Sequence, residues 1–213
     1  MESGCGFLEI SLEVSKEALR DFLLRFRAVK PSHVIIGLGN PGTQYRATRH
    51  NIGFQAIDYL SKIFAEGEWS EKQKFHALVQ EARIITVPIL LMKPLTFMNR
   101  SGEAVKKIID FYKLNPAEQL LVISDDVDLP LGEVRYREKG GPGTHNGLRS
   151  IVEQIGEGFP RIRIGLGTAP AGSDLATWVL SSLTNEELQA LQKSYEKLPE
   201  LLKIFFRNDD PMK

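Results

Sequence analysis

Residues 37–54 read GLGNPGTQYRATRHNIGF, and this stretch does most to decide the fold. The apolar run at residues 33–38 leads into it and predicts a buried strand. Asn40 and the Pro-Gly pair that follows it predict a turn where that strand ends. Periodic apolar residues then predict a helix over residues 51–64, directly after His50. A strand, a turn with a polar tip and a nearby histidine are typical of the way α/β proteins place chemistry at the carboxyl edge of a sheet.

Strands and helices alternate along the rest of the chain. The apolar patterns predict strands at residues 75–81, 83–87, 89–92, 120–123, 133–137 and 162–166, and helices at residues 101–112 and 148–155. Residues 184–187 read TNEE, a capping box that opens a helix running toward Phe206, with a break at Pro199. This alternation predicts an α/β fold in which helices cover both faces of one sheet.

Residues 1–32 are expected to form an N-terminal extension in front of a domain at residues 33–213. Residues 8–12 alternate as in a short strand, and residues 15–29 place apolar side chains at helical spacing. We therefore expect a strand plus an amphipathic helix, with a role in packing or partner contact rather than in catalysis. The segment lacks the basic start and continuous apolar core of a secretory signal, and its acidic residues oppose a transit peptide.

The composition fits a protein that folds around an ordinary apolar core, since 42% of the 213 residues are hydrophobic and 25% are charged. The single cysteine, Cys5, excludes a disulfide framework and favours a reducing compartment, for which we expect the cytoplasm. No apolar run approaches the ~20 residues that span a bilayer, so we expect no membrane association. A formal net charge of zero argues against tight binding of nucleic acid by charge alone, but it leaves room for a local basic patch.

The string from Gly37 to Gly42 also satisfies the G-x-G-x-x-G pattern of dinucleotide-binding proteins. Two features oppose that interpretation. Pro41 has no amide hydrogen to donate to a pyrophosphate, and the predicted helix begins near Asn51 rather than at the turn. A plain Asn-Pro-Gly turn and a turn that presents Asn40 to a substrate both remain open.

His50 is the first candidate for chemistry, because histidine titrates near neutral pH and can act as a general base. The alternative is a histidine that only forms hydrogen bonds at a helix start. The acidic run at residues 124–128, SDDVD, follows a predicted strand and has three interpretations. One carboxylate orients His50, as the third member of a triad does; the carboxylates bind a divalent metal; or they are solvated acids of a turn.

A third polar cluster, TFMN at residues 96–99, stands at the start of a predicted helix. Thr96 is a candidate cap for that helix. Asn99 offers both a donor and acceptors to a ligand. Met98 is either a core residue or an apolar wall beside Asn99.

A fourth cluster is the glycine-rich loop KGGPGTHNG at residues 139–147, which enters a predicted helix. Exposed amides at such a helix start can bind an anion, and His145 and Asn146 can contact substrate or hold a water. The alternative is a mobile loop with a capping asparagine. The chain contains no G-x-S-x-G, no H-E-x-x-H and no paired C-x-x-C motif, so a His–Asp pair would act on water.

Taken in order, these segments resemble the bacterial-type peptidyl-tRNA hydrolase family over about residues 33–183. The matching strings are GLGNPGTQYRATRHNIGF, KPLTFMNRSGEAV, ISDDVDLPLGEVRYREKGGPGTHNGLRSI and FPRIRIGLG. The resemblance implies a single three-layer α/β/α domain around a twisted mixed sheet, with no metal and no cofactor. It implies a monomeric enzyme of translation that binds peptidyl-tRNA and cleaves the ester between peptide and tRNA, which rescues tRNA from stalled ribosomes.

The resemblance also implies roles for eight residues. His50 takes the position of the catalytic base, and Asp125 takes that of its carboxylate partner. Six residues take positions that bind or position substrate: Asn40, Tyr45, Met98, Asn99, His145 and Asn146.

The chain departs from the family pattern near these positions. Ser124 stands where bacterial members commonly have histidine, and Pro142 and Thr144 stiffen a loop that usually ends in Gly-Gly. None of these changes removes a proposed catalytic group. Some members of the superfamily are RNA-binding proteins that act with protein partners and lack evident hydrolase activity, and a homologue of that kind is the alternative function.

Basic side chains beside the motifs are candidates for contacts with tRNA phosphates. For any one of them, an ordinary solvated surface is an equally good interpretation, so the prediction is a patch rather than a set of contacts. The candidates are Lys93, Arg100, Lys106, Arg135, Arg137, Lys139 and Arg149.

Overall fold

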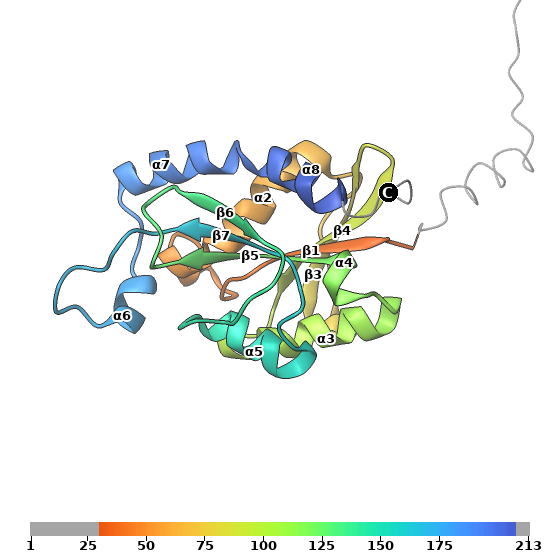
Figure 1. Cartoon of the computed structure of the whole chain (residues 1–213), viewed down its shortest axis with the longest axis horizontal. Helices are drawn as coiled ribbons and strands as arrows, with labels where there is room; N and C mark the ends of the chain where they lie inside the picture. The colour runs from red at the N-terminus through yellow and green to blue at the C-terminus, as the bar shows by residue number, and fades with distance from the viewer. Residues whose placement is uncertain (1–29, 208–213) are drawn as a thin grey trace, which may run out of the picture. The chain divides into compact units, whose positions relative to one another are not determined.

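The computed structural model describes residues 30–207, and Figure 1 shows how their helices and strands are arranged. The strand and amphipathic helix predicted for the N-terminal extension lie outside the described residues, so the extension and its boundary stay predictions. Within residues 30–207, no helix is both long and apolar enough to cross a membrane.

A seven-stranded mixed sheet forms the centre of the described part, in the order β2-β3-β4-β1-β5-β7-β6. β1 runs parallel to both of its neighbours, β4 and β5, and β5 runs parallel to β7. Antiparallel strands form the edges, with β2 and β3 on one side and β6 on the other. β1 and β5 are buried along their whole length, as expected for central parallel strands. The strands are β1 (His33–Gly37), β2 (Ser70–Lys72), β3 (Ala77–Ile84), β4 (Val87–Pro94), β5 (Leu120–Asp126), β6 (Val134–Arg137) and β7 (Arg161–Gly165).

Helices cover both faces of the sheet (Figure 1). One face packs against α2, α7 and α8, and the other packs against α3 and α5. Successive side chains of β1 alternate between these two cores, with Ile35 in the first and Val34 and Ile36 in the second. The predicted three-layer α/β/α fold around a mixed sheet is therefore confirmed. The helices are α2 (Ile52–Phe64), α3 (Ser101–Tyr112), α4 (Pro116–Gln119), α5 (Asn146–Ile155), α6 (Leu175–Val179), α7 (Asn185–Tyr195) and α8 (Leu198–Arg207).

The sheet differs from the prediction on the β2 side. We expected strands at residues 75–81, 83–87 and 89–92, but the chain forms two longer strands, β3 and β4, joined at Ile85 and Thr86. Ile85 has a left-handed backbone (φ 57°) and is 84% exposed, as expected for a residue in a hairpin turn. Because isoleucine is apolar, the sequence pattern placed it in a strand instead. The short strand β2 was not predicted, because its sequence SEK carries no apolar pattern.

Two predictions about polar residues at the ends of elements are also corrected. β5 extends through Asp126, because Asp125 pairs with Ile164 of β7, so these two acids belong to a strand and not to a turn. Thr96 caps no helix: its hydroxyl is buried without a partner among the described residues, and α3 begins after Arg100 without a side-chain cap.

The predicted C-terminal helix is confirmed together with its break. The Thr184 hydroxyl accepts a hydrogen bond from the Glu187 backbone, and the Glu187 carboxylate accepts one from the Thr184 backbone, which completes the capping box of α7. α7 ends at Tyr195 and α8 begins at Leu198, so Pro199 lies in the first turn of a helix, where proline is tolerated.

A contact between two glycines brings α2 onto β1 and so positions the turn that carries His50. A Cβ atom on Gly37 would lie 2.1 Å from the carbonyl oxygen of Gly53, and one on Gly53 would lie 2.4 Å from the amide nitrogen of Leu38. Backbone therefore packs directly against backbone at this crossing. The Leu38 carbonyl also accepts a hydrogen bond from the Phe54 amide (3.1 Å), which ties the start of α2 to the end of β1.

Candidate active site

The carboxyl ends of β1, β4 and β5 lie side by side in the middle of the sheet, at the place where the order of strands reverses direction. In open α/β sheets, ligands bind at such a switch point. The predicted site residues come from the segments that leave these strands or enter the nearby helices. Asn40 follows β1, Met98 and Asn99 follow β4, Asp125 lies near the end of β5, His50 precedes α2, and His145 and Asn146 open α5.

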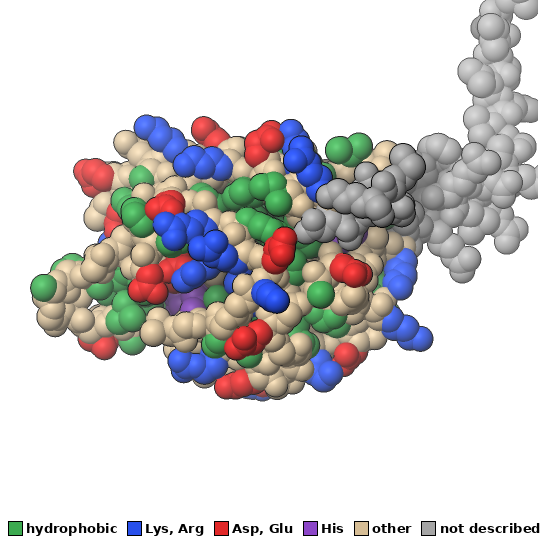
Figure 2. Space-filling model, viewed as in Figure 1, with side chains coloured by type: hydrophobic (Ala, Val, Ile, Leu, Met, Phe, Trp, Pro, Cys, Tyr) green, Lys and Arg blue, Asp and Glu red, His purple; other side chains and the backbone are tan. Residues whose placement is uncertain are grey.

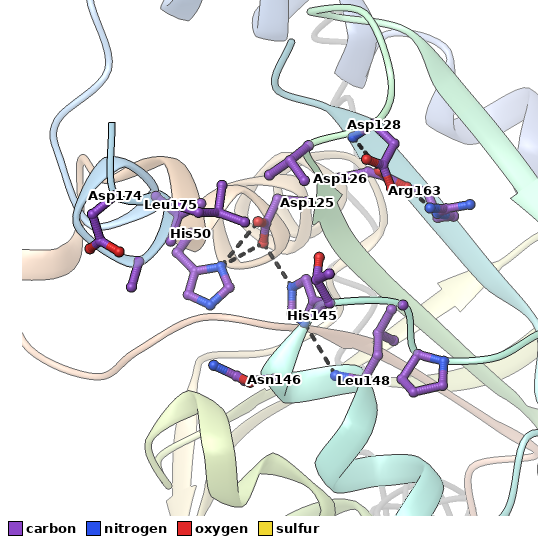
Figure 3. A pocket seen from close by; sticks show the side chains of 16 residues that line it. His50, Asp125, Asp126, Asp128, His145, Asn146, Leu148, Arg163, Asp174 and Leu175 are labelled. Atoms are coloured by element: carbon purple, nitrogen blue, oxygen red, sulfur yellow. Dashed lines mark hydrogen bonds and ion pairs between the residues drawn. The ribbon is translucent and has the colours of Figure 1, made fainter. Parts of the chain in front are cut away.

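His50 is held by Asp125. The Nδ1 atom of His50 lies 3.0 Å from both carboxylate oxygens of Asp125, a contact that Figure 3 marks with dashed lines. Both residues are buried, with exposed fractions of 8% and 3%. The carboxylate accepts the Nδ1 proton, so the neutral ring keeps its lone pair on Nε2, which has no hydrogen-bond partner among the described residues. A general base and its orienting acid have this geometry.

His145 makes a second hydrogen bond to the same carboxylate. Its Nε2 atom lies 3.0 Å from Oδ1 of Asp125, and its Nδ1 atom accepts from the backbone amides of Gly147 (3.1 Å) and Leu148 (3.2 Å) at the start of α5. Because two N–H groups point at Nδ1, the proton of the neutral ring is on Nε2, and His145 donates to Asp125. Both ring nitrogens thus have partners within the chain, and substrate contact through His145 stays a prediction.

The nitrogen and oxygen atoms of His50, Asp125 and His145 lie within 4.8 Å of one another, a spacing that could hold a metal ion. The hydrogen bonds oppose this use. A histidine that binds a metal through Nε2 carries its remaining proton on Nδ1 and donates it. Nδ1 of His145 instead faces two donors, the amides of Gly147 and Leu148. The residues therefore fit a metal poorly, which supports the prediction of a site that works without one.

Burial and charge act in opposite directions on the His–Asp pair. Burial by itself would lower the pKa of His50, but the charge of Asp125 and the hydrogen bond to it outweigh burial and raise that pKa above its ordinary value. Burial would raise the pKa of Asp125, but His50 and His145 hold it well below its usual range. Asp125 is therefore ionised at neutral pH and can stabilise the positive ring that forms when His50 takes a proton.

Asn40 is fixed by a network that local sequence patterns do not indicate. The Asn51 side chain accepts a hydrogen bond from the Asn40 amide (2.9 Å) and donates one to the Asn40 carbonyl (2.9 Å). The Asn40 Oδ1 atom accepts from the backbone amide of Met98 (2.8 Å), which leaves its Nδ2 group to donate to a ligand. Asn51 is thus a site residue that the sequence analysis missed, and its position beside His50 was the only signal.

His50 lies between two cavities. The first, of about 330 Å³, is lined by residues of β5, β7, α6 and the loop before α5, and Figure 3 shows them around His50 and Asp125. The second, of about 350 Å³, is lined by Asn40, Phe97, Met98, Asn99, Ala176 and Leu180. His50 and Asn146 line both cavities. The histidine can therefore act on a bond in a substrate that occupies both sides of it.

Met98 and Tyr45, two predicted substrate-binding residues, differ in their relation to the second cavity. Met98 is 4% exposed and belongs to the core beneath the sheet while it also lines the cavity, so both interpretations of this residue apply. Tyr45 does not line either cavity; its ring makes an edge contact with Phe97, with centroids 6.4 Å apart. Five of the residues to which the resemblance assigns roles border these two adjoining cavities: Asn40, His50, Asn99, Asp125 and Asn146.

Arg49 is a second residue that the sequence analysis missed. Its guanidinium donates two hydrogen bonds to the Glu187 carboxylate (3.0 and 2.7 Å) and one to the Ser181 hydroxyl (2.6 Å), and it lies 5.1 Å from the centre of the Trp178 ring. It therefore fastens the turn of His50 to α6 and the start of α7. Glu187 lies 138 residues away, so only the fold reveals this contact.

The loop at residues 139–145 is attached to the sheet. Arg161 of β7, which is 2% exposed, donates a hydrogen bond to the Gly141 carbonyl (3.3 Å). Pro142 and Thr144, the two departures from the usual loop sequence, both line the first cavity. The stiffening expected from these two residues would therefore act at the wall of the site.

One of the seven candidate phosphate contacts is wrong. Lys93 is 9% exposed, forms an ion pair with Asp58, and lies 4.6 Å from the centre of the Trp69 ring. Burial lowers its pKa, although Asp58 opposes the change. Figure 2 shows basic and acidic side chains interspersed on the face that it draws. The other six candidates are exposed: Arg100, Lys106, Arg135, Arg137, Lys139 and Arg149.

Comparisons with known sequences identify relatives over most of the chain. A family model described as peptidyl-tRNA hydrolase matches residues 34–213. A peptidyl-tRNA hydrolase of Chloroflexus aurantiacus is 43% identical over 175 residues, covering 82% of this chain and 92% of that protein. One of Fusobacterium nucleatum is 47% identical over 165 residues, covering 78% and 84%. The chloroplastic peptidyl-tRNA hydrolase of Arabidopsis thaliana is 44% identical over 173 residues, but the match spans only 59% of that relative.

A solved structure has the same fold. The crystal structure of peptidyl-tRNA hydrolase from Acinetobacter baumannii matches this chain with a TM-score of 0.78 at 33% sequence identity, over 85% of this chain and 92% of that one. Family model, relatives and fold agree over the segment that carries the crevice. The chain belongs to the peptidyl-tRNA hydrolase family.

Proposed function

We propose that the chain hydrolyses the ester bond joining a peptide to the terminal ribose of tRNA, with His50 as the general base and Asp125 as its orienting acid. The pairing of His50 Nδ1 with Asp125 is the observation that carries the proposal, because it leaves Nε2 able to take a proton beside two cavities. No serine or cysteine is among the described residues that line either cavity, and the Thr144 hydroxyl, which lines the first, has no hydrogen bond to His50, so we assign water as the nucleophile.

The reaction begins when Nε2 of His50 takes a proton from a water molecule. The resulting hydroxide adds to the ester carbonyl carbon and forms a tetrahedral intermediate. The bond from this carbon to the ribose oxygen then breaks, and the ribose oxygen takes the proton back from His50. The products are a peptide with a free carboxyl group and a tRNA with a free terminal hydroxyl. Asp125 stabilises the positive ring between the two proton transfers.

Three side-chain amides are the proposed donors to the charge that develops on the carbonyl oxygen. Asn40 presents its Nδ2 group, since Met98 occupies its Oδ1 atom, and Asn99 shares the second cavity with it. Asn146 lines both cavities and is the best placed to hold the attacking water. One well-placed donor of this kind lowers the barrier by about 2–4 kcal/mol.

The test of this proposal is the variant His50→Ala. We expect hydrolysis of peptidyl-tRNA to fall by roughly 10²–10⁴-fold, because the base is lost, while tRNA affinity stays within about twofold of the wild type. His76→Asn is the matched control: His76 is exposed, lies outside both cavities and has a left-handed backbone that asparagine tolerates. This control should hydrolyse at the wild-type rate.

Two results would contradict the proposal in different ways. Wild-type turnover by His50→Ala means that another group is the base. A wild-type chain that binds tRNA but does not cleave peptidyl-tRNA supports the non-catalytic RNA-binding alternative instead.

The proposal also covers the setting in which the enzyme works. We place it in the cytoplasm as a monomer that binds tRNA and returns it to translation from peptides released at stalled ribosomes. Light scattering at working concentration should give a mass near the 23.9 kDa of one chain. A mass near twice that value would remove the monomer from the proposal without changing the chemistry.

A further inference from the structure

We propose that His145 is a positioning residue that sets how strongly Asp125 acts on His50. The inference rests on the proposed function, in which His50 is the base. It assigns to His145 a role within the protein, in place of the substrate contact that the sequence suggested.

The direction of each hydrogen bond at His145 is fixed by its neighbours. The amides of Gly147 and Leu148 both donate to Nδ1, so the ring proton is on Nε2 and points at Oδ1 of Asp125, 3.0 Å away. This donation does not depend on whether His50 carries one proton or two. His145 is therefore a constant donor to the carboxylate, whereas His50 changes its charge during the reaction.

Asp125 divides its charge between two donors. Its Oδ1 atom lies 3.0 Å both from Nδ1 of His50 and from Nε2 of His145. A hydrogen bond to a carboxylate stabilises its charge and makes it a weaker acceptor for any other donor. His145 therefore moderates the attraction between Asp125 and the positive ring of His50, and it holds the carboxylate in the orientation that His50 needs.

His145 also connects this charge balance to the loop at residues 139–145. The amide of His145 donates to the Pro142 carbonyl (3.2 Å), and Arg161 holds the Gly141 carbonyl one residue earlier. The bond from His145 to Asp125 is therefore held from the loop as well as from the start of α5.

No charged residue other than Asp125 forms a hydrogen bond or an ion pair with His50 in the described part of the chain. Four other charged residues line the first cavity: Asp126, Asp128, Arg163 and Asp174. Asp126 and Arg163 form an ion pair with each other. Arg49, on the turn of His50, forms an ion pair with Glu187.

The test separates the two bonds of His145 with the variant His145→Asn. Asparagine is a good N-cap and can accept the amides of α5, but its side chain is too short to reach Asp125. We expect the NMR titration of the His50 ring to move to higher pH, because Asp125 then acts on His50 alone. The acidic limb of kcat/KM should move in the same direction. kcat should fall about tenfold, the effect of losing one hydrogen bond to a charged group, with KM within about twofold.

Two further variants give the controls. His145→Gln can restore a donor to Asp125 and should bring the His50 titration back toward the wild type. His145→Ala loses the cap as well as the donor, so its melting temperature should fall by about 2–4 °C relative to His145→Asn. Four histidines in the chain keep the assignment of the His50 signal simple.

The titration is measured without substrate, so it does not depend on hydrolysis. If the His50 titration in a folded His145→Asn variant coincides with that of the wild type, the positioning role is wrong, even if the enzyme hydrolyses peptidyl-tRNA. If the titration moves but the wild-type chain cleaves no peptidyl-tRNA, the coupling stands and the proposed function fails.

Discussion

Asp125 makes the pH response of this site opposite to the one that burial alone would produce. A buried histidine is normally easier to deprotonate, because burial disfavours the charged form. Asp125 reverses this effect at His50 and raises its pKa above the ordinary value. Since the base must be neutral to accept a proton, kcat/KM should rise with pH, with a midpoint above the value near 6.5 of an unperturbed histidine.

The variant Asp125→Asn tests this balance. The amide carries no charge, so burial acts on His50 without opposition and its pKa falls below the wild-type value. The acidic limb of the profile should therefore move to lower pH. The maximal kcat should fall by roughly 10²–10⁴-fold, because the positive ring is no longer stabilised. Rates of hydrolysis measured across the pH range show both effects.

Asp128→Asn is the matched control for that experiment. Asp128 is exposed, lines the same cavity, and forms no ion pair with His50 among the described residues. Its loss should leave the midpoint of the acidic limb in place. A limb that moves equally in both variants would mean that the general field of the cavity acts on His50, and not the contact with Asp125.

The sequence was a better guide to where the candidate site residues lie than to the residues that hold them in place. Asn40 follows β1 and Asp125 lies near the end of β5, so the rule for carboxyl ends of parallel strands brings them together, and His50 stands in the connection from β1 to α2 at the same edge. Asn51 and Arg49 act through partners that no local pattern specifies, such as a backbone amide in another segment or a carboxylate 138 residues away. Such roles need the folded geometry.

At the scale of the elements, α2 packs directly on the backbone of β1. The Gly37→Ala variant would put a methyl group 2.1 Å from the Gly53 carbonyl oxygen, between two stretches of backbone that cannot rotate away. We expect it to destabilise the fold by about 1–3 kcal/mol, the usual cost of an overpacked core. α2 would also move outward with the turn that carries His50, so activity should fall even where the protein stays folded. Urea unfolding and hydrolysis at low temperature measure the two effects.

Gly158→Ala provides the comparison for this element. A Cβ atom at Gly158 meets nothing within 4 Å, and its backbone does not require glycine. This substitution should leave stability within about 1 kcal/mol of the wild type, or raise it slightly, because alanine restricts the unfolded chain. Equal destabilisation by both variants would show that the contact between α2 and β1 has no special role.

Elements with strong apolar periodicity were predicted well, and those defined by turns or edges were not. α3 has the predicted bounds, because its apolar stripe is regular and buried. The boundary between β3 and β4 was predicted in the wrong place, because Ile85 is apolar but occupies an exposed turn between the two strands. The residues of β2, with the sequence SEK, are half-buried or exposed and carry no apolar pattern. They form a strand because they pair with the edge of β3. Pairing with a neighbour, rather than local propensity, decides such strands.

On the scale of the whole molecule, a net charge of zero has to be compatible with the proposed binding of tRNA, which is a polyanion. Long-range attraction to tRNA is then weak, and phosphate contacts must come from a local group of basic side chains. Arg100 is exposed and directly follows Asn99, on the side of the sheet covered by α3 and α5. Its ion pair with Glu103 is also exposed and contributes little to stability, so it can exchange for a phosphate.

The variant Arg100→Gln tests whether this side of the sheet contacts tRNA phosphates. Each phosphate contact releases condensed counterions, so the logarithm of tRNA affinity falls linearly with the logarithm of salt concentration. Losing one contact should reduce the magnitude of that slope by about 1 and weaken binding at low salt. Lys203→Gln is the matched control, because Lys203 is exposed on α8, which packs on the opposite face of the sheet, and has a similar exposed pair with Glu200. The control should keep the wild-type slope. An unchanged slope in Arg100→Gln would mean that Arg100 does not contact a tRNA phosphate. An equal reduction of the slope in both variants would mean that the total charge of the protein, and not a contact at Arg100, determines the salt dependence.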